Sequence, residues 1–421
     1  RRVVAAMGAL PATLLLPGTC PAAAEGSAGQ PAARKEPVRE TLWGEEIVDS
    51  YRWMENPKDA EWEPFMKGEA AYARRVLDSI PGRKALYERV TQLSGDLPIA
   101  NVPQSTSKGR LFYELRPSGA NQFKLYMREG VNGAERLLVD PSILRGPNDV
   151  HMSLDWWLAS PDGRYVVYGL SPAGSENSVA QVLDVDSNKI LSERIDRTQY
   201  AHPSWLPDSS GFFFNRLAEG VKLGAQDYYL NSVEWLHRVG TDPKQDIRVL
   251  SRGQYPGVAL EPTDFPAVFA DPTSRSVVAV AIGGVRRENP LYVASLESVL
   301  ANQPQWRKVC DVADEVTGFA FRGDELFLQT TRDAPNAKVL RTKLSAPDLA
   351  LATTVVPEGQ NVIDAIAVAR DGLYVKDMDG GYNGLRRLGN DGKVQAIKLP
   401  FEGSFDSIST ETREDGAWLL G

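Results

Sequence analysis

The stretch Pro161-Asp162-Gly163-RYVVYGL, which ends at Leu170, places a tight turn directly before a run of β-branched and aromatic residues. A turn followed by such a run is typical of a β-strand that begins at a hairpin. The same unit recurs at six other places: Lys108-Gly109 before LFYEL, Pro207-Asp208-Ser209 before SGFFF, Asp271-Pro272-Thr273 before SVVAVAI, Gly323-Asp324 before ELFLQT, Asp371-Gly372 before LYVKD, and Glu414-Asp415-Gly416 before AWLL. Successive copies lie roughly 45 to 65 residues apart, which is the period of four-stranded propeller blades.

The repeat predicts a mainly β fold, a seven-bladed β-propeller over residues 99–421 whose seventh blade is incomplete. Within the second copy, runs at residues 179–185 and 190–195 supply two further strands around a turn at 186–189. The polar stretch from Gly220 to Leu230 is expected to be a loop at one rim of the propeller. The seventh copy reaches Gly421 after about one strand, so we expect the sequence to be a fragment of a longer open reading frame.

Residues 38–98 have a different pattern. Between Asp59 and Ile80 the apolar residues recur mostly every three, four or seven positions, which predicts one amphipathic helix. Asp59 is the expected N-cap, and Pro81-Gly82 is expected to end the helix. A second, shorter helix is predicted over residues 83–93.

The N-terminus resembles a secretory signal. Arg1 and Arg2 precede an apolar run that reaches Leu16, and Ala22-Ala23-Ala24 fits cleavage after small residues. Residues 1–24 are therefore predicted to be a signal peptide and residues 25–37 a flexible leader, which makes the protein periplasmic or secreted. The apolar run is too short to span a membrane. Cys20 raises the alternative of a lipoprotein, although the residues before it form a poor lipobox, and the two arginines raise that of twin-arginine export.

Composition excludes several classes of partner. The 421 residues are 42% hydrophobic and 24% charged, as in ordinary folded proteins, and the net charge is −8 without a long block of one sign. Nucleic acid is not an expected partner, because phosphate binding needs clustered Lys and Arg. With only two cysteines, Cys20 and Cys310, a disulfide or metal framework is excluded. No P-loop or dinucleotide motif is present, and no cofactor is expected.

A search for catalytic motifs finds none. The nucleophile elbow G-x-S-x-G does not occur, and the nearest match, around Ser171, lacks the second Gly and has Pro172 where a backbone donor would be needed. Ser171 is therefore interpreted as part of a turn. The acidic stretch from Asp184 resembles an EF-hand loop but has Lys189 at the Gly position, so it is interpreted as a hairpin turn. Asp377 and Asp379 form a second acidic turn, a weak candidate for a cation.

The histidines and tryptophans point to packing. His151, His202 and His237 belong to no metal pattern and are interpreted as packed or surface residues. Trp156, Trp157, Trp205 and Trp235 are expected between blades, with ligand stacking as the minority alternative. No catalytic, cofactor-binding or metal residue is assigned in this sequence.

The most specific motif precedes the first predicted helix. Asp49-Ser50-Tyr51-Arg52-Trp53-Met54-Glu55-Asn56-Pro57 resembles D-P-Y-R-W-L-E-D-P, a hallmark of the prolyl oligopeptidase family of serine peptidases, with mild changes at positions 50, 54 and 56. Further similarity lies in YGLSPAGSE at 168–176, WLHRVGT at 235–241 and TRDAPN at 331–336. The resemblance covers roughly residues 38–421 and favours the proline-specific branch of the family.

The resemblance implies a seven-bladed propeller that caps an α/β-hydrolase domain, to which residues 38–98 would belong. It also implies a monomeric endopeptidase that cleaves short peptides after proline, with the propeller restricting entry. The catalytic Ser, Asp and His of the family have no counterpart here, so this chain alone is expected to be inactive. In the family, Trp53, Trp62, Phe65 and Tyr72 would pack against the hydrolase domain.

Two alternatives remain open. The chain could be a non-catalytic periplasmic propeller that binds a peptide or protein, or it could belong to a basic-specific oligopeptidase or an exopeptidase. A G-x-S-x-G elbow encoded downstream of Gly421 would favour the peptidase, and a stop codon would favour the binding module.

Overall fold

The computed structural model describes residues 29–94 and 97–420. The predicted signal peptide, including Cys20, lies outside the described residues, as does the start of the predicted leader. The chain forms two compact units, one before Leu97 and one from Leu97 onwards. No helix of the described residues combines the length and the apolar character needed to cross a bilayer.

The N-terminal unit contains a hairpin and two helices. Its elements are β1 (Val38–Leu42), β2 (Glu45–Asp49), the 3-10 helix η1 (Arg52–Glu55), α1 (Trp62–Asp78) and α2 (Arg83–Ser94). Both predicted helices are present, but the N-cap of α1 is Glu61 and not Asp59. The Asp59 carboxylate instead accepts hydrogen bonds from the Glu61 amide and from Arg34, each at 2.9 Å. Asp59 therefore closes the turn before the helix.

The motif around Tyr51-Arg52-Trp53 has a structural role in this unit. Arg52 binds Asp49 at 2.9 Å and reaches Glu40 on β1 at 2.7 Å. These hydrogen bonds from Arg52 lower the pKa of both carboxyls. Trp53 is buried, donates its indole N–H to the Arg34 carbonyl at 2.8 Å and meets the Phe65 ring edge-on at 5.7 Å. Trp53 thus has packing partners within its own unit.

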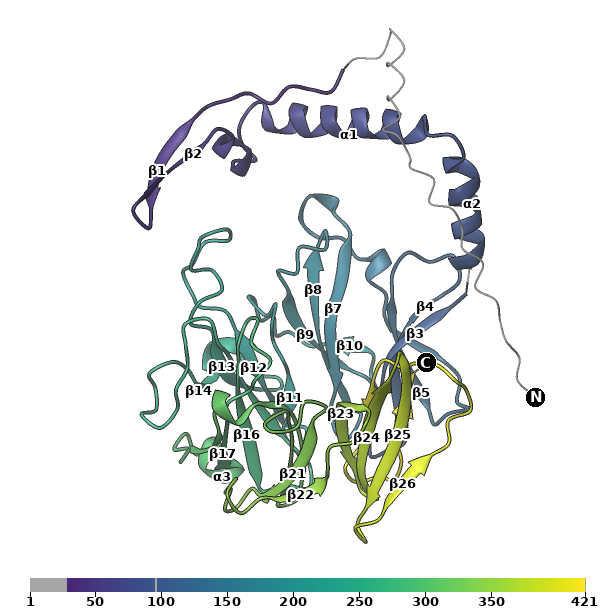
Figure 1. The fold of residues 1–421 in the computed structure, drawn as a ribbon, viewed down its shortest axis with the longest axis vertical. Helices are drawn as coiled ribbons and strands as arrows, with labels where there is room; N and C mark the ends of the chain where they lie inside the picture. The colour runs from purple at the N-terminus through teal and green to yellow at the C-terminus, as the bar shows by residue number, and fades with distance from the viewer. Residues whose placement is uncertain (1–28, 95–96, 421) are drawn as a thin grey trace, which may run out of the picture. The chain divides into compact units, whose positions relative to one another are not determined.

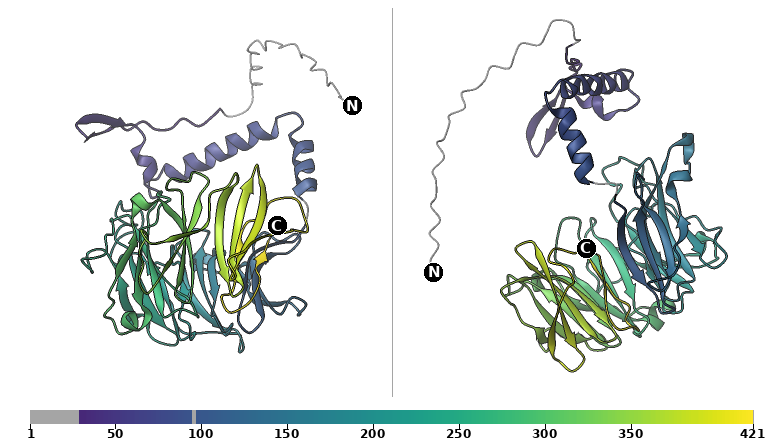
Figure 2. Two further views of the ribbon diagram at one scale, coloured as in Figure 1. Left: turned by 60° about the horizontal axis from the view of Figure 1, so that its bottom comes forward. Right: turned by 90° about the vertical axis from the view of Figure 1, so that its right-hand side faces the viewer.

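The second unit consists of antiparallel sheets arranged around an axis (Figures 1 and 2). Six sheets have four strands each, hydrogen-bonded in chain order. Their strands are, for blade 1, β3 (Ile99–Ser105), β4 (Arg110–Arg116), β5 (Lys124–Glu129) and β6 (Arg136–Val139); for blade 2, β7 (Met152–Ala159), β8 (Tyr165–Pro172), β9 (Val179–Asp184) and β10 (Lys189–Ile190); and for blade 3, β11 (Ser204–Trp205), β12 (Gly211–Arg216), β13 (Val233–Arg238) and β14 (Ile247–Leu250).

Blade 4 comprises β15 (Phe265–Ala270), β16 (Ser276–Ile282), β17 (Leu291–Ser295) and β18 (Arg307–Cys310); blade 5 comprises β19 (Val316–Arg322), β20 (Glu325–Thr330), β21 (Lys338–Lys343) and β22 (Thr353–Val356); and blade 6 comprises β23 (Val362–Ala369), β24 (Gly372–Asp379), β25 (Tyr382–Gly389) and β26 (Val394–Ile397). A short helix, α3 (Leu296–Leu300), follows β17. The first strands of blades 1 to 4 lie nearest the axis, because residues of β3, β7, β11 and β15 line one common cavity.

The propeller is confirmed, but the predicted count of seven blades is wrong: the described residues form six. Every copy of the repeat is the turn that precedes the second strand of a sheet. The seventh copy forms only β27 (Ile408–Ser409) and β28 (Trp418–Leu419), a sheet of two paired strands with two residues each. This sheet has two strands in place of the four of a complete blade, although Ile408 and Leu419 pack against a core shared with blade 6.

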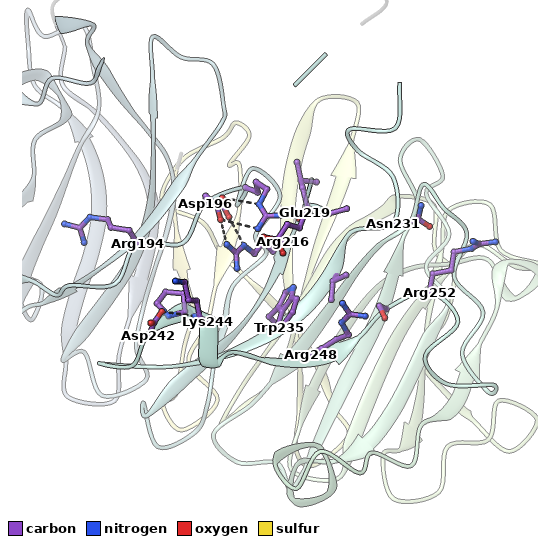
Figure 3. A pocket seen from close by; sticks show the side chains of 16 residues that line it. Arg194, Asp196, Arg216, Glu219, Asn231, Trp235, Asp242, Lys244, Arg248 and Arg252 are labelled. Carbon is purple, nitrogen blue, oxygen red and sulfur yellow. Dashed lines mark hydrogen bonds and ion pairs between the residues drawn. The ribbon is translucent and has the colours of Figure 1, made fainter. Parts of the chain in front are cut away.

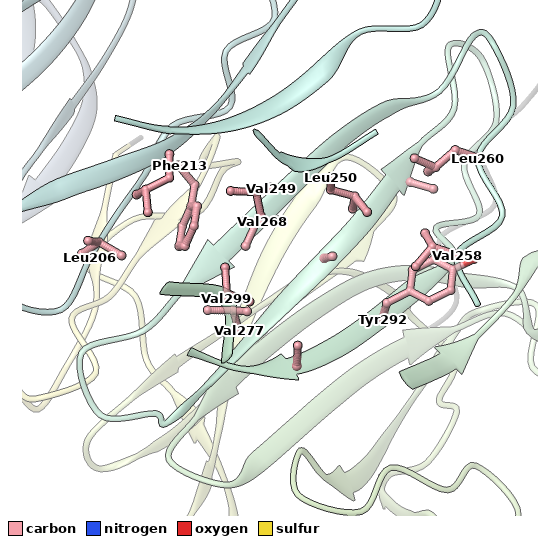
Figure 4. Close-up of a cluster of buried hydrophobic side chains, with 14 residues drawn as sticks. Leu206, Phe213, Val249, Leu250, Val258, Leu260, Val268, Val277, Tyr292 and Val299 are labelled. Carbon is pink, nitrogen blue, oxygen red and sulfur yellow. The ribbon is translucent and has the colours of Figure 1, made fainter. Parts of the chain in front are cut away.

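Each pair of neighbouring blades shares a hydrophobic core between the two sheet faces. Between blades 3 and 4, for example, Phe213 and Leu236 pack with Val268, Val277 and Tyr292 (Figure 4). Successive side chains of a strand point to opposite faces of its sheet. Alternate residues of the second strand of a blade therefore pack against the preceding and the following blade. A blade buried on both faces therefore reads as a continuous apolar run such as SVVAVAI.

Polar side chains also link neighbouring blades through the backbone of the next first strand. Gln104 of blade 1 both donates to and accepts from the backbone of Ala159, at 3.0 and 2.9 Å. From blade 3, Asn215 donates to the Pro266 carbonyl at 2.8 Å, and Glu234 accepts from the Val268 amide at 2.9 Å. The strands of one sheet do not form backbone hydrogen bonds with those of the next. These side chains therefore satisfy buried backbone groups that would otherwise lack a partner.

The segment that leads from β27 to β28 extends across the axis at the end where the repeat turns lie. Thr412 donates to the Asp271 carboxylate of blade 4 at 2.7 Å, and Arg413 donates to the Pro161 carbonyl of blade 2 at 3.0 Å. Residues Thr410 to Thr412 also line the cavity that the first strands of blades 1 to 4 share, about 160 Å³ in volume. Residues 410–413 therefore connect the two-stranded sheet of β27 and β28 to blades 2 and 4.

Replacing Thr412 tests this connection. Thr412→Ala removes one donor from the Asp271 carboxylate, so we expect the free energy of unfolding of this chain to fall by about 1 kcal/mol. Urea titration followed by tryptophan fluorescence measures the change. Thr354→Ala, at an exposed position of β22, is the matched control. Equal effects of the two substitutions would contradict the connection.

Glu234 provides a test of pH dependence. Complete burial raises its pKa well above the ordinary carboxyl value. Above the ordinary carboxyl pKa of about 4.3 the unfolded chain releases this proton while the folded chain keeps it, so the contribution of Glu234 to stability falls as pH rises. We expect wild type to lose more stability than Glu234→Gln between pH 5 and pH 8, measured as urea midpoints. Parallel pH profiles would show that Glu234 does not cause the dependence.

Candidate functional site

An apolar pocket of about 380 Å³ opens on blades 3 and 4, where their first strands begin. Its walls come from the link before β11, the end of the 220–230 insertion, the start of β15 and the end of β16. The lining residues are Tyr200, His202, Tyr229, Leu230, Thr263, Phe265, Ile282, Gly283 and Gly284. A pocket of this size and character fits an apolar side chain or ring.

Aromatic contacts hold the walls of the pocket. The ring of Tyr200 lies 4.9 Å from that of Phe265, edge-on, and 5.9 Å from that of Tyr229. Tyr228 packs edge-on against Tyr229 at 4.9 Å and donates its hydroxyl to Asn177 at 3.0 Å. Partial burial raises the pKa of Tyr228, which keeps this hydroxyl protonated. These rings form a preorganised apolar surface with few rotatable bonds.

The remaining walls of the pocket leave its interior free of side chains. Gly284 has no neighbour within 4 Å of the position that a Cβ would take, so this wall carries no side chain. The insertion is anchored beside the pocket because the Asn231 amide donates to the Pro262 carbonyl at 2.7 Å. The pocket contains no carboxylate, thiol or lysine, and His202 makes no hydrogen bond there. The aromatic and aliphatic lining residues suit the binding of an apolar group.

Ser171, the nearest sequence match to a nucleophile, bonds to a carboxylate and not to a histidine. It is fully buried in β8 and donates to Asp155 at 3.0 Å. The same carboxylate accepts a hydrogen bond from Ser178, and the Glu176 amide donates to Ser171 at 3.2 Å. These contacts fix the turn after β8, as the sequence interpretation proposed.

The three histidines lie apart from one another. His151 is exposed at the start of blade 2, and His202 lines the apolar pocket. The side chain of His237 is fully buried, with Nδ1 2.7 Å from the Asp246 carboxylate and Nε2 3.9 Å from Glu193. Burial raises the pKa of Asp246, against the opposing effect of its bond to His237. No substrate-sized space adjoins His237 among the described residues, so it is a packed histidine.

The two acidic turns are occupied by internal partners. Asp184 accepts hydrogen bonds from the amide and the hydroxyl of Ser187, both at 2.9 Å, which makes the hairpin turn that the sequence predicted. Asp377 binds the Arg386 guanidinium through both oxygens, at 2.6 and 2.7 Å. Within the described ranges, no three His, Cys, Asp or Glu side chains gather in a way that could hold a metal ion.

The tryptophans of blades 2 and 3 pack between blades. Trp157 and Trp205 are buried, and their indole groups donate to Glu114 at 3.0 Å and to the Leu158 carbonyl at 3.1 Å. Trp156 donates to the Thr198 carbonyl at 2.8 Å. Trp235 also packs at the blade interface, but its ring lines a second cavity at the rim.

Sequence reasoning did not identify the apolar pocket. Its aromatic residues lie 29 and 36 positions apart along the chain, at Tyr200, Tyr229 and Phe265, in segments without a shared motif. The signals that were available are the Tyr228-Tyr229 pair at the end of a polar insertion and the Gly283-Gly284 pair after an apolar strand. Neither signal indicates a pocket until the blades bring the segments together.

Comparison with known proteins agrees with the fold. The chain matches the family model described as "Prolyl oligopeptidase, N-terminal beta-propeller domain" over residues 30–419. It is 22% identical over 395 residues to the prolyl endopeptidase of Elizabethkingia meningoseptica, covering 91% of this chain and 52% of that protein. It is 24% identical over 351 residues to prolyl oligopeptidase A of Amanita bisporigera, covering 76% of this chain and 45% of that protein.

Solved structures give the same result. One from a study of two prolyl endopeptidases superposes with a TM-score of 0.77 at 26% identity, covering 90% of this chain and 54% of that one. Prolyl oligopeptidase B from Galerina marginata, bound to a 35mer hydrolysis and macrocyclization substrate, has the same fold, with a TM-score of 0.75 at 19% identity, covering 93% of this chain and 56% of that one. The chain spans about half the length of the curated relatives it matches. The family match covers nearly all of the described residues, and the chain therefore belongs to the prolyl oligopeptidase family through its N-terminal β-propeller region.

Proposed function

We propose that this chain is the N-terminal and propeller portion of an exported serine endopeptidase that cleaves short peptides after proline. The family match over residues 30–419 carries the proposal. In the proposed endopeptidase, the propeller limits access to a catalytic domain outside this sequence. The protein acts as a monomer in the periplasm or outside the cell. The catalytic serine, aspartate and histidine belong to that domain.

Exposed apolar side chains on the N-terminal unit support the proposal that a further domain covers this unit. Leu86, Tyr87 and Leu93 on α2 expose 65 to 67% of their surface. Burying a large apolar side chain contributes about 1.5–3 kcal/mol, so these side chains favour a covered state. A hydrolase domain packed against α1 and α2 would cover them.

The apolar pocket beside Tyr200 supports peptide binding by the propeller. A prolyl ring or another apolar side chain stacks well on tyrosine and phenylalanine. Since the pocket offers no charged group, it would bind the apolar part of a substrate and leave cleavage to the catalytic domain.

Activity measurements test the assignment of catalysis. We expect no turnover of a chromogenic Gly-Pro peptide by this 421-residue chain, because no serine hydroxyl is hydrogen-bonded to a histidine ring among its described residues. The parent protein, extended to the end of its reading frame, should cleave the peptide and lose activity with a serine-reactive inhibitor. Ser171→Ala should leave the parent enzyme's turnover unchanged. Inhibitor-sensitive turnover by the short chain, abolished in Ser171→Ala, would refute the proposal.

Peptide binding tests the pocket. Tyr200→Ala and Phe265→Ala should each weaken binding of a short proline-containing peptide by about tenfold, which corresponds to roughly 1.4 kcal/mol. Isothermal titration of the parent protein, with its nucleophile removed, measures the dissociation constant. Tyr382→Ala, an exposed tyrosine of blade 6, is the control. Unchanged affinity in both pocket variants would show that the peptide binds elsewhere.

A further inference from the structure

A second cavity, of about 850 Å³, lies along the rim between blades 2 and 3 (Figure 3). The link between β10 and β11 forms one wall, and the ends of β12 and β13, the β13–β14 turn and β14 form the other. Six of its lining residues are basic and three are acidic: Arg194, Arg197, Arg216, Lys244, Arg248 and Arg252 against Asp196, Glu219 and Asp242. We refer to this cavity as the rim groove.

The excess of positive charge in the rim groove is local. The whole chain has a net charge of −8, so a basic cavity does not follow from its composition. Asp196 is already engaged, since it pairs with both Arg216 and Arg197. Among the described residues, Lys244, Arg248 and Arg252 form no ion pair. Arg194 forms no ion pair with a described residue either and donates to backbone carbonyls, so four cations in one cavity lack an anionic partner.

Two arginines in the wall of the groove are held in position by backbone carbonyls. Arg194 donates to the carbonyls of Leu191 and Glu193 at 2.8 and 2.7 Å. Arg197 donates to the Leu217 carbonyl at 3.3 Å. Fixed guanidinium groups lose little entropy when they bind a carboxylate, which makes them effective binding groups.

An aromatic surface adjoins these charges. The Arg248 guanidinium lies 5.5 Å from the centre of the Trp235 ring, and Figure 3 shows the two side chains together in the groove. The contact orients Arg248, and the indole offers an apolar surface to a ligand side chain. The ligand that fits best therefore combines separated negative charges with an apolar group.

We propose that the rim groove binds an acidic, extended peptide segment that carries at least two Asp or Glu side chains and one apolar side chain. Its carboxylates pair with Lys244, Arg248 and Arg252, and its apolar side chain packs on Trp235. Glu219 and Asp242 also line the groove, and their carboxylates disfavour a ligand with densely spaced phosphates. The groove is a binding site additional to the apolar pocket, and its occupancy does not depend on peptidase activity.

Fluorescence anisotropy with a labelled eight-residue peptide tests the proposal. The probe carries four Glu and one Leu, and its control has Gln in place of every Glu. We expect the acidic peptide to bind this chain at least tenfold more tightly than the control peptide, because bidentate pairs between Arg and carboxylate are the strong hydrogen bonds at such sites. Equal affinity for the two peptides would overturn the proposal.

Charge reversal locates the site. Lys244→Glu combined with Arg248→Glu should weaken binding of the acidic peptide at least tenfold, whereas Lys393→Glu combined with Lys398→Glu on blade 6 changes net charge equally and should have little effect. Lys244→Glu alone, at an exposed turn, keeps the test valid if the double variant fails to fold. Similar losses in both double variants would indicate general charge attraction and overturn the proposal.

Two further measurements identify the ligand class. Trp235→Ala should weaken the binding of the Leu-containing acidic peptide. It should weaken less the binding of a version with Gly in place of Leu. Tripolyphosphate should compete poorly with the peptide at matched ionic strength. Stronger competition by tripolyphosphate than by unlabelled acidic peptide would assign the groove to phosphates and overturn the proposal of a peptide.

Discussion

Packing of sheet faces between neighbouring blades is the interaction on which the rest of this structure depends. No strand ladder joins one blade to the next, so each core must hold two sheets together by apolar contact. Between blades 4 and 5, for instance, Val278 and Val293 meet Leu326 and Leu328, all four of them buried. The few polar links, such as Glu234 to the Val268 amide, satisfy buried backbone groups within these cores. Dispersion and hydrophobic burial thus position every loop that carries a binding residue.

Both binding candidates lie where two blades meet. The apolar pocket uses Tyr200 and Tyr229 of blade 3 with Phe265 of blade 4, and the rim groove uses Arg197 of the preceding link with Arg248 of blade 3. A blade interface brings together side chains that are distant in sequence and supports them on packed sheets. Such support keeps the aromatic rings and the guanidinium groups preorganised for a ligand.

The motif that identified the family works mainly as a structural element. Arg52 binds Glu40 and Asp49, and Trp53 closes over Phe65, so this stretch builds the N-terminal unit itself. Its specificity as a sequence signal comes from this set of local contacts, which few other residues could reproduce. The exposed side chains of α2, such as Leu86, are those that a further domain would cover.

The sequence by itself determined the repeat, the strands and the two helices, because turn residues and apolar periodicity act over a few neighbouring positions. It also indicated that Ser171 and Asp184 serve turns, and in the structure they lie at the ends of β8 and β9 and bond to the turns that follow. Only the tertiary structure decided the number of complete blades, the position of the Thr412 contact and the composition of both cavities. Those features depend on contacts between residues far apart in the chain, such as Thr412 with Asp271, and no local pattern encodes such distances.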